Sequence, residues 1–422
     1  MIYLNYYNVK ILEQKLNLIL ELCNSINDFD KHFLGSGIFD KHAQVGLPDG
    51  IENFKDGTSP KMMGKISLGI SMLRDTIELL FHYLQPDCIV SDMYYHWTVE
   101  SAAKLGVQIL HYYSSSYFSR CCYHFIMKHK PPENFVSDNE VFSIPGIPHN
   151  IEVTSLQLDE WMRSRNKFSD YMDTIYESEK KSYGTLYNSF HELEGDYEQL
   201  YKSTMGNKAW SVGQVSTCVN KGHDEDLAVD SEMLNWHNSK PNDSVLYVSF
   251  GSLTRLSHAQ IVEITHGLEN SGHNFIWVVR KKDEDGDEDE DGVFQTFEER
   301  MKDIKKAKRG GILTHCGRNS ILESLNAGLP MITWPMFSEQ FYNEKLLVDV
   351  LKIGVSVGSK ANKFWWSLGE DALVRREEIA KAVVLLMGSE EESIEIRCRA
   401  KKLGIESNTT PPAIRGMDIE QA

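Results

Sequence analysis

Short apolar runs alternate with amphipathic segments along most of the chain. Early in the sequence, residues 88–91 have the composition of a buried strand, residues 98–104 the period of a helix, and residues 107–112 that of a second strand. The second half repeats this alternation, with apolar strands expected at residues 244–250, 275–279, 311–314 and 331–334. Continuous apolar strands separated by helices are typical of a parallel sheet covered on both faces. The pattern therefore predicts an α/β fold with doubly wound sheets.

The segments between these strands set the expected domain boundaries. Residues 144–210 carry mainly helical patterns and no convincing strand, so they would cover the first sheet. The polar and aperiodic stretch that follows is typical of a linker, and the last residues show no helical period. We therefore predict an N-terminal domain over residues 1–215, a linker over 216–235, a C-terminal domain over 236–403 and a disordered tail over 404–422.

Length and charge narrow the class of protein. A chain of 422 residues is long enough for two hydrophobic cores. Of the net charge of −17, eight negative charges fall within residues 283–291, a run that repels itself and is expected to be a solvated loop. The sequence has no basic stripe that could neutralise a phosphate backbone, which argues against nucleic acid as a partner.

Cysteine usage and hydropathy indicate the compartment. The seven cysteines are odd in number, scattered and without metal-ligand spacing, which favours a reducing environment and predicts no metal site. No run approaches the roughly 20 apolar residues of a membrane helix, and charges interrupt the apolar stretch at residues 11–23. We therefore expect a cytoplasmic protein without stable membrane insertion, and favour a monomer.

The densest chemical signal lies between residues 310 and 345. A short apolar strand is expected to end at His315, followed by a Cys-Gly turn and a helix that Asn319 and Ser320 open. Ligands of doubly wound sheets bind at the carboxyl ends of strands, and free amides at a helix N-terminus attract phosphate. Ser320-x-x-Glu323 can equally be read as a capping box that satisfies the helix's own amides.

This segment, HCGRNSILE followed by a proline and Glu-Gln, resembles the signature box of plant family 1 UDP-glycosyltransferases, HCGWNSxLE…P…EQ. The resemblance implies that His315, Asn319 and Ser320 bind the donor pyrophosphate and that Glu323 binds the ribose. Glu339 and Gln340 would bind the hydroxyls of the donor sugar. The implied donor-binding set is completed by Gly317 and Arg318 in the box and by Ser252 and Thr254.

Two further segments extend the resemblance. Residues 247–254 (YVSFGSLT) are similar to the family's donor loop, and residues 87–102 to the strand that carries its catalytic aspartate, here Asp92. The implied fold is GT-B, with two doubly wound Rossmann-like domains facing a cleft, the donor in the second domain and a lipophilic acceptor in the first. The implied reaction is inverting transfer without metal or cofactor, because the UDP-sugar is a co-substrate.

Segments 43–56, 142–149 and 183–198 are most similar to legume triterpenoid-saponin glycosyltransferases. This implies transfer of galactose or glucose to a hydroxyl of a triterpenoid saponin or a similar plant metabolite.

The sequence departs from the family pattern at four points. One is at the end, where the tail after Leu403 replaces the family's closing C-terminal helix. The first strand and its Gly-His, the source of the general base, are not recognisable near the start. No Trp-Ala-Pro-Gln segment, whose tryptophan stacks on uracil, precedes Gly310, and Arg318 replaces the usual tryptophan. Three alternatives follow: a catalytically impaired relative, UDP-glucuronic acid as donor through Arg318, or a sequence from which exons have been lost.

Overall fold

The computed structural model describes residues 2–4, 45–47, 59–130, 137–213, 236–237, 239–251, 253–278, 309–362 and 373–409. These residues form two compact units. The first lies within Met1–Arg120 and Ser164–His223, and the second within Cys121–Arg163 and Asp224–Thr410. Residues 121–163 thus group with the second unit, although the sequence placed them in the first domain.

The first unit is built on a five-stranded sheet of order β1-β2-β3-β6-β7. From β2 onward the strands are parallel, with Asp92 at the end of β2 paired to Tyr112 of β3. The strands are β1 (Ile2–Leu4), β2 (Cys88–Asp92), β3 (Gln108–Tyr113), β6 (Gly184–Tyr187) and β7 (Ala209–Ser211). The helices that accompany them are α4 (Pro60–Ser71), α5 (Arg74–Leu84), α6 (Thr98–Leu105), α9 (Lys167–Lys181) and α10 (His191–Met205). Helix α7 (Tyr117–His129) begins in this unit, and its residues from Cys121 onward belong to the second.

The second unit has a five-stranded parallel sheet of order β12-β11-β10-β8-β9 and a small antiparallel ribbon, β4-β5. Its main strands are β8 (Val245–Ser249), β9 (Asn274–Trp277), β10 (Arg309–Thr314), β11 (Met331–Thr333) and β12 (Gly354–Ser356). The ribbon consists of β4 (Val141–Ser143) and β5 (Glu152–Thr154). The helices are α8 (Glu160–Arg163), α13 (His258–Asn270), α15 (Arg318–Asn326), α16 (Gln340–Lys345), α17 (Arg376–Met387), α18 (Glu391–Thr409), a 3-10 turn (Ser155–Gln157) and a π-helix (Leu346–Val350).

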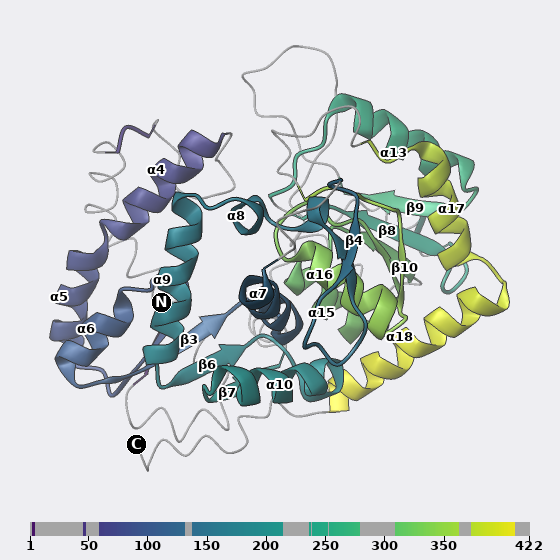
Figure 1. Ribbon diagram of the computed structural model, residues 1–422. Coiled ribbons are helices and arrows are strands. Elements are labelled where there is room, and N and C mark those ends of the chain that lie inside the picture. Colours follow the sequence, from purple (N-terminus) through teal and green to yellow (C-terminus); the bar gives the residue numbers. More distant parts are fainter. Residues whose placement is uncertain are drawn as a thin grey trace. The chain divides into compact units, whose positions relative to one another are not determined.

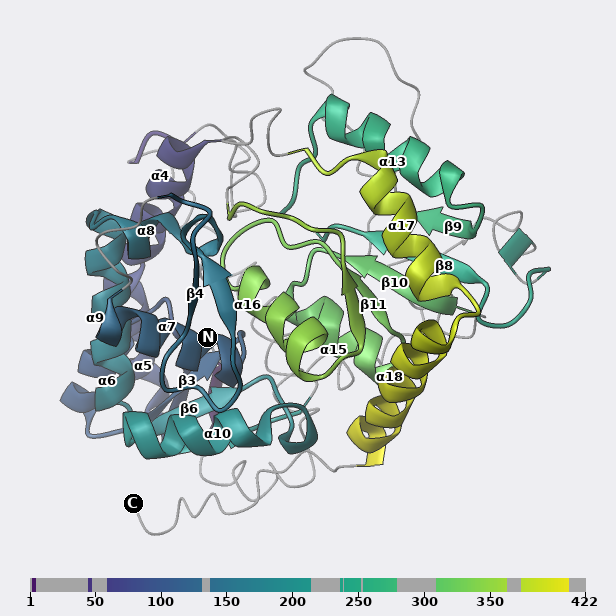
Figure 2. The same cartoon turned by 45° about the vertical axis from the view of Figure 1, so that its right-hand side comes forward.

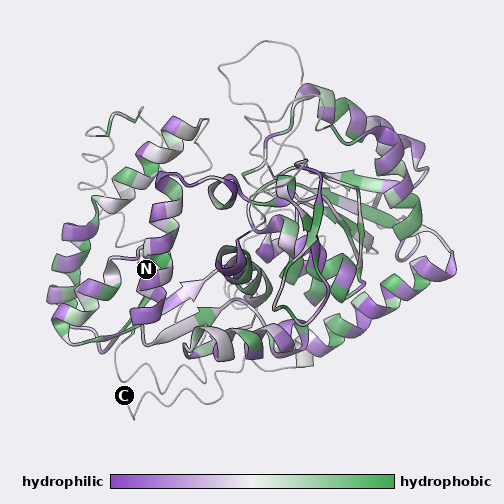
Figure 3. Ribbon diagram, in the orientation of Figure 1, coloured by the Kyte–Doolittle hydropathy of each residue, from purple (hydrophilic) through white to green (hydrophobic). Residues whose placement is uncertain are grey.

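Helices cover both faces of this second sheet, with α15 and α16 on one side and α13 and α17 on the other (Figures 1 and 2). The strands are hydrophobic along most of their length, whereas the helices alternate between polar and apolar residues (Figure 3). On the α13 and α17 face, Leu246, Val248 and Leu313 pack with Ile264 and Leu386 in one buried cluster. This doubly wound arrangement directs the carboxyl ends of β8, β10 and β11 to one edge of the sheet.

The observed elements confirm most of the predicted strands and helices and correct others. The interpretation of residues 144–210 as lacking strands is wrong, because β5, β6 and β7 lie within them. Strand β12 was not predicted, and β1 is a strand in the opening segment, although it runs antiparallel to β2. Helix α18 continues to Thr409, so the tail does not start at residue 404. The linker at 216–235 and the tail beyond 409 lie outside the described residues.

A buried ion pair stabilises the first unit. The Arg120 guanidinium is 4% exposed and the Glu179 carboxylate 2%, with Nη2 and Oε2 separated by 2.7 Å. Tyr201 donates a second hydrogen bond, of 2.6 Å, to the other oxygen of Glu179, and Arg120 lies 4.0 Å from the ring centroid of Tyr176. Because each charge is buried and paired with the other, losing one would leave the other charged and buried without its counter-ion.

We expect Glu179→Gln to lower the free energy of unfolding by about 3–5 kcal/mol, because the Arg120 charge would remain buried without its counter-ion. Glu177→Gln is the matched control, since Glu177 lies on the same helix but pairs with Lys180 at an exposed position. It should cost no more than about 1 kcal/mol. Urea unfolding followed by circular dichroism measures both, and equal losses would contradict this role of the pair.

Candidate functional site

Two parallel strands of the second unit end side by side at the carboxyl edge of the sheet. Thr314, the last residue of β10, pairs with Ser249, the last residue of β8. Gly251 therefore follows one strand and His315 the other at the same edge. The loop after β8 also carries Thr254, whereas Ser252 lies outside the described residues.

The His315 imidazole packs directly against two glycines. A Cβ built on Gly251 or on Gly317 would approach the ring to under 3.0 Å. Gly251 also has φ +71°, a left-handed conformation that L residues adopt only at a cost. The position of His315 thus depends on the absence of a side chain at both neighbours.

Burial sets the protonation state of His315. It lowers the pKa of the imidazole to about 4, so the ring is neutral at physiological pH. Its Nδ1 is buried and has no hydrogen-bond partner among the described residues, and the same holds for Oγ1 of Thr254. Buried polar atoms of this kind are rare in proteins and call for an explanation, for which a bound ligand is one candidate.

Helix α15 begins next to His315 without a side-chain cap. Its N-cap residue is Gly317, which has no side chain to cap the helix. Ser320 is the third residue of the helix, so the alternative that Ser320 and Glu323 form a capping box is wrong. The positive end of the helix dipole lies at this N-terminus and favours an anion.

The remaining residues of the signature segment lie on or beside this helix. Arg318 is the first helical residue and is 4% exposed, whereas Asn319 is exposed. Glu323, one turn further on, is partly exposed. The structure therefore brings His315, Gly317, Arg318, Asn319 and Ser320 together around one strand end and one helix N-terminus.

Glu339 and Gln340 begin helix α16, at the end of the loop that follows β11. Oε1 of Gln340 accepts hydrogen bonds from the backbone N–H groups of Met336 (2.9 Å) and Phe337 (3.2 Å). Glu339 is the N-cap residue and is partly exposed. Gln340 thus shapes the loop, while Glu339 remains the more accessible of the two.

Asp92 ends β2 in the first unit. Its Oδ1 accepts a hydrogen bond of 3.0 Å from the backbone N–H of Tyr94, and burial raises the pKa of the carboxyl above its usual value. In the described part of the chain, no histidine forms a hydrogen bond or ion pair with Asp92. The general base that the resemblance implies is therefore not among the contacts that Asp92 makes with described residues.

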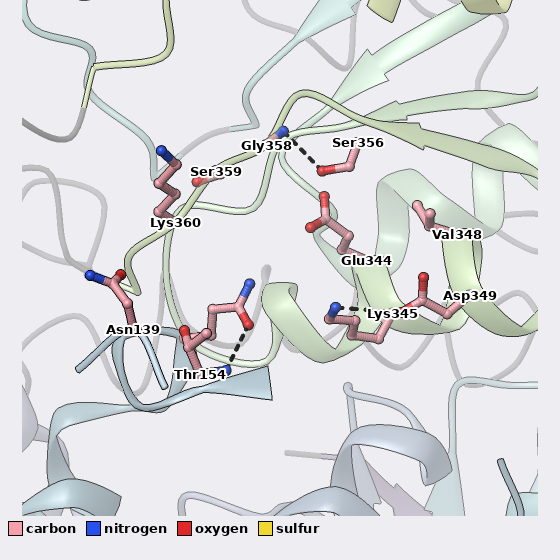
Figure 4. A pocket seen from close by; sticks show the side chains of 11 residues that line it. Asn139, Thr154, Glu344, Lys345, Val348, Asp349, Ser356, Gly358, Ser359 and Lys360 are labelled. Carbon is pink, nitrogen blue, oxygen red and sulfur yellow. Dashed lines mark hydrogen bonds and ion pairs between the residues drawn. The ribbon is translucent and has the colours of Figure 1, made fainter. Parts of the chain in front are cut away.

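A polar pocket of about 370 Å³ lies elsewhere in the second unit, between α16, the segment after β12 and the β4-β5 ribbon. Glu344 extends from α16 below Ser356, and Lys345 pairs with Asp349 at 3.4 Å (Figure 4). Burial raises the pKa of Glu344 to about 7, against a hydrogen bond of 2.6 Å from Thr333. None of the residues predicted from the sequence lines this pocket.

Sequence reasoning missed three buried polar residues near α16, namely Glu344, Asp159 and Asn362. Glu344 lies one residue before the end of the predicted signature segment, and its place there is the sequence signal that marks it. Asp159 and Asn362 are 203 residues apart in sequence and join through a hydrogen bond of 3.3 Å. No local pattern marks such a pair.

Neither a metal centre nor a membrane span is found in the parts that the structure covers. Within the described ranges, no three His, Cys, Asp or Glu side chains gather as metal ligands. Each described helix is too short or too polar to cross a bilayer.

We expect Gly251→Ala to destabilise the second unit by about 1–3 kcal/mol more than Gly272→Ala, because only the former forces a methyl group against His315. Gly272 is the matched control, since it has φ +68° in the same unit but no atom within 4 Å of a built Cβ. Both variants share the cost of a left-handed alanine, about 1–2 kcal/mol. Thermal unfolding of the two variants checks the difference, and equal midpoints would argue against this contact.

The low pKa of His315 predicts a pH dependence of stability. A base whose pKa falls from about 6.5 in the unfolded chain to about 4 in the fold stabilises the protein above pH 6.5, and loses that contribution as the pH falls toward 4. Between these two pH values the free energy of unfolding should fall by up to about 3 kcal/mol less in His315→Gln than in the parent protein. Urea unfolding at several pH values measures it, with the exposed His258→Gln as control. An unchanged slope in His315→Gln would contradict the burial of a neutral ring.

Comparison with known proteins identifies the family. A family profile described as UDP-glucoronosyl and UDP-glucosyl transferase matches residues 164–359. A soyasapogenol B glucuronide galactosyltransferase of Glycine max is 46% identical over 387 residues, covering 86% of this chain and 77% of that protein. A UDP-glucosyl transferase of Saponaria officinalis is 40% identical, covering 94% of this chain and 82% of that protein.

Solved structures agree with these relatives. A Glycyrrhiza uralensis UGT complexed with glycyrrhetinic acid 3-O-monoglucuronide superposes with a TM-score of 0.79 at 43% identity, covering 86% of this chain and 77% of that one. A Phytolacca americana UGT complexed with UDP-2fluoro-glucose and pterostilbene gives a TM-score of 0.65 at 25% identity, covering 82% and 78%. The chain therefore belongs to the UDP-glucuronosyl and UDP-glucosyl transferase family and has its two-domain GT-B fold.

Proposed function

We propose that this UDP-glycosyltransferase transfers galactose or glucose from a UDP-sugar to a hydroxyl of a triterpenoid saponin or a similar plant secondary metabolite. Family membership establishes the coarser activity, glycosyl transfer from a UDP-sugar to a plant metabolite. The names of two relatives support the finer one. The Glycine max protein is named for soyasapogenol B glucuronide, and the Glycyrrhiza uralensis structure holds a monoglucuronide. We therefore propose an acceptor that already carries glucuronic acid.

The N-terminus of α15 beside His315 is the observation that supports the donor site in this proposal. The helix begins after Gly317, which has no side-chain cap, and the buried, unpartnered Nδ1 of His315 lies beside it where two parallel strands end. A diphosphate supplies acceptor oxygens for such groups, and the helix dipole favours its charge. We assign the pyrophosphate to His315, Asn319 and Ser320, and to Thr254 in the loop after the neighbouring strand β8. Ser252, outside the described residues, is assigned with them from the sequence.

The sugar and ribose are assigned to the carboxylates and amide that follow. Glu323 is proposed to bind the ribose hydroxyls, and Glu339 with Gln340 the hydroxyls of the sugar. Arg318 is buried at 4% exposure, which disfavours an outward guanidinium that could pair with a uronic acid carboxylate. For that reason we propose a neutral hexose and not glucuronic acid as the transferred group.

On the acceptor side, Asp92 is proposed as the carboxylate that orients a general base. The base takes the proton from the acceptor hydroxyl, whose oxygen attacks the anomeric carbon and displaces UDP with inversion. The carboxyl end of β2, where Asp92 lies, is the edge at which doubly wound sheets bind ligands. Helix amides and hydrogen bonds would stabilise the charge of the departing UDP.

We expect the purified chain to form a product heavier by one hexose when UDP-galactose or UDP-glucose is supplied with soyasapogenol B glucuronide, and none with UDP-glucuronic acid. Asp92→Asn should slow this by about 10²–10⁴-fold, because an oriented base contributes that much. Asp87→Asn is the control, because Asp87 is exposed and lies directly before the first residue of the same strand, β2. Mass spectrometry of the product measures both. Transfer of glucuronic acid, or an Asp92 variant as fast as Asp87→Asn, would contradict these assignments.

A second candidate is a donor-binding relative with impaired catalysis. The observation that favours it comes from the sequence, because no Trp-Ala-Pro-Gln segment occurs anywhere in the 422 residues. The uracil of the donor would therefore lack the tryptophan on which it stacks in the family. Stacking of a base on an aromatic ring contributes about 1–3 kcal/mol. Binding of UDP without any product from either hexose donor would favour this candidate over active transfer.

A further inference from the structure

One buried amide in the second unit joins three separate segments of the chain. Asn362, 6% exposed, donates its backbone N–H to the carbonyl of Leu156 at 2.7 Å. Its side-chain Nδ2 donates to the carbonyl of Gln157 (3.2 Å), to Oδ1 of Asp159 (3.3 Å) and to the carbonyl of Ser338 (3.2 Å). Its Oδ1 accepts from the backbone N–H of Ser338 at 2.9 Å. Every polar atom of this side chain is therefore used.

The residue that Asn362 holds most completely is Ser338, and its backbone is unusual. Ser338 has φ +59°, the left-handed region that a residue with a side chain adopts at a cost of about 1–2 kcal/mol. Asn362 satisfies both the N–H and the C=O of this one residue. A strained backbone persists where the surroundings over-determine it, and here the amide supplies that constraint.

The strained turn lies directly before the residues assigned to the donor sugar. Glu339 and Gln340 follow Ser338, and Gln340 fixes the loop from its other side by accepting from Met336 and Phe337. The direction in which the Glu339 carboxylate leaves the helix therefore depends on the conformation at Ser338.

The buried carboxylate of Asp159 also belongs to this network. Tyr123 donates a hydrogen bond of 2.7 Å to Oδ2 of Asp159, while Asn362 donates to Oδ1. The pKa of Asp159 is raised to about 6, mainly by burial and to a lesser extent by the negative charge of Glu339. The chain of contacts thus runs from Tyr123 through Asp159 and Asn362 to the turn that carries Glu339.

We propose that Asn362 is a positioning residue for donor-sugar recognition, because it clamps the left-handed turn at Ser338 and thereby sets the orientation of Glu339. This rests on the proposed function, in which Glu339 binds the sugar hydroxyls. Only an amide can serve here, since the site needs one acceptor for the Ser338 N–H and an NH2 group whose two N–H donors are shared among the three surrounding oxygens. An aspartate of the same size has no donor and would face Asp159 with a second negative charge.

The chain offers a matched control for a purely structural role. Gln260 is also a buried amide of the second unit, and it clamps both backbone groups of a single residue, Val374. Its Nε2 donates to the Val374 carbonyl at 2.9 Å, and its Oε1 accepts from the Val374 N–H at 3.0 Å. Losing this clamp removes the same two kinds of bond at a place away from Glu339.

The experiment measures binding of UDP and of UDP-glucose by calorimetry to the full chain and to four variants, Asn362→Ala, Asn362→Asp, Gln260→Ala and Glu339→Ala. We expect both Asn362 variants to weaken UDP-glucose by at least about tenfold, with UDP itself within about twofold, because only the sugar contacts change. Gln260→Ala should lower the unfolding midpoint while leaving the ratio of the two affinities unchanged. Two substitutions at Asn362 keep the test informative if one variant does not fold.

The outcomes separate the inference from the proposed function. If Glu339→Ala lowers the ratio of UDP-glucose affinity to UDP affinity but neither Asn362 variant does, the positioning role is wrong and the sugar assignment stands. If Gln260→Ala lowers the ratio as much as the Asn362 variants, the effect is general destabilisation and the inference is overturned. If Glu339→Ala leaves the ratio unchanged, the sugar assignment fails, and the inference that rests on it fails too.

Discussion

Contact between one imidazole and two glycine backbones is the constraint on which the candidate site in the second unit depends. His315 follows β10, Gly251 follows the neighbouring β8, and Gly317 is the N-cap of α15, so the ring packs where the ends of two strands meet the start of a helix. No side chain can be added at either glycine without moving the ring or the strand ends. The alignment of β8 with β10, the start of α15 and the protonation state of His315 are therefore linked.

Around this contact the second unit uses neutral amides to hold its loops. Gln260 clamps Val374, Gln340 clamps the loop after β11, and Asn362 clamps Ser338, each through backbone groups that would otherwise lose their partners. A buried amide avoids the desolvation cost of an ion and still matches one donor and one acceptor. The first unit, in contrast, buries the Arg120 and Glu179 charges, which require a full set of partners.

The sequence allowed the sheets to be predicted where strands are long apolar runs, as at β2 and β8. It failed at β6 and β12, because Gly184–Tyr187 and Gly354–Ser356 are short and contain glycine and hydroxyl residues that only tertiary pairing places in a sheet. In the candidate site, the signature segment identified His315, Asn319 and Glu339, whose roles in binding stay predictions. Asp159 and Asn362 could not be found this way, because their contact joins residues 203 positions apart.

The chemistry of a neutral His315 bears on how a diphosphate would be held. Burial lowers the pKa of the ring to about 4, so at neutral pH it can offer one N–H but no positive charge. The charge of the phosphates must then be met by the amides and dipole of α15, which are fixed in the backbone and need no reorganisation. A phosphate beside the ring would in turn favour its protonated form, since an opposite charge at close range raises the pKa of a base. A phosphate held beside His315 would therefore bind more tightly as the pH falls toward the pKa of the ring.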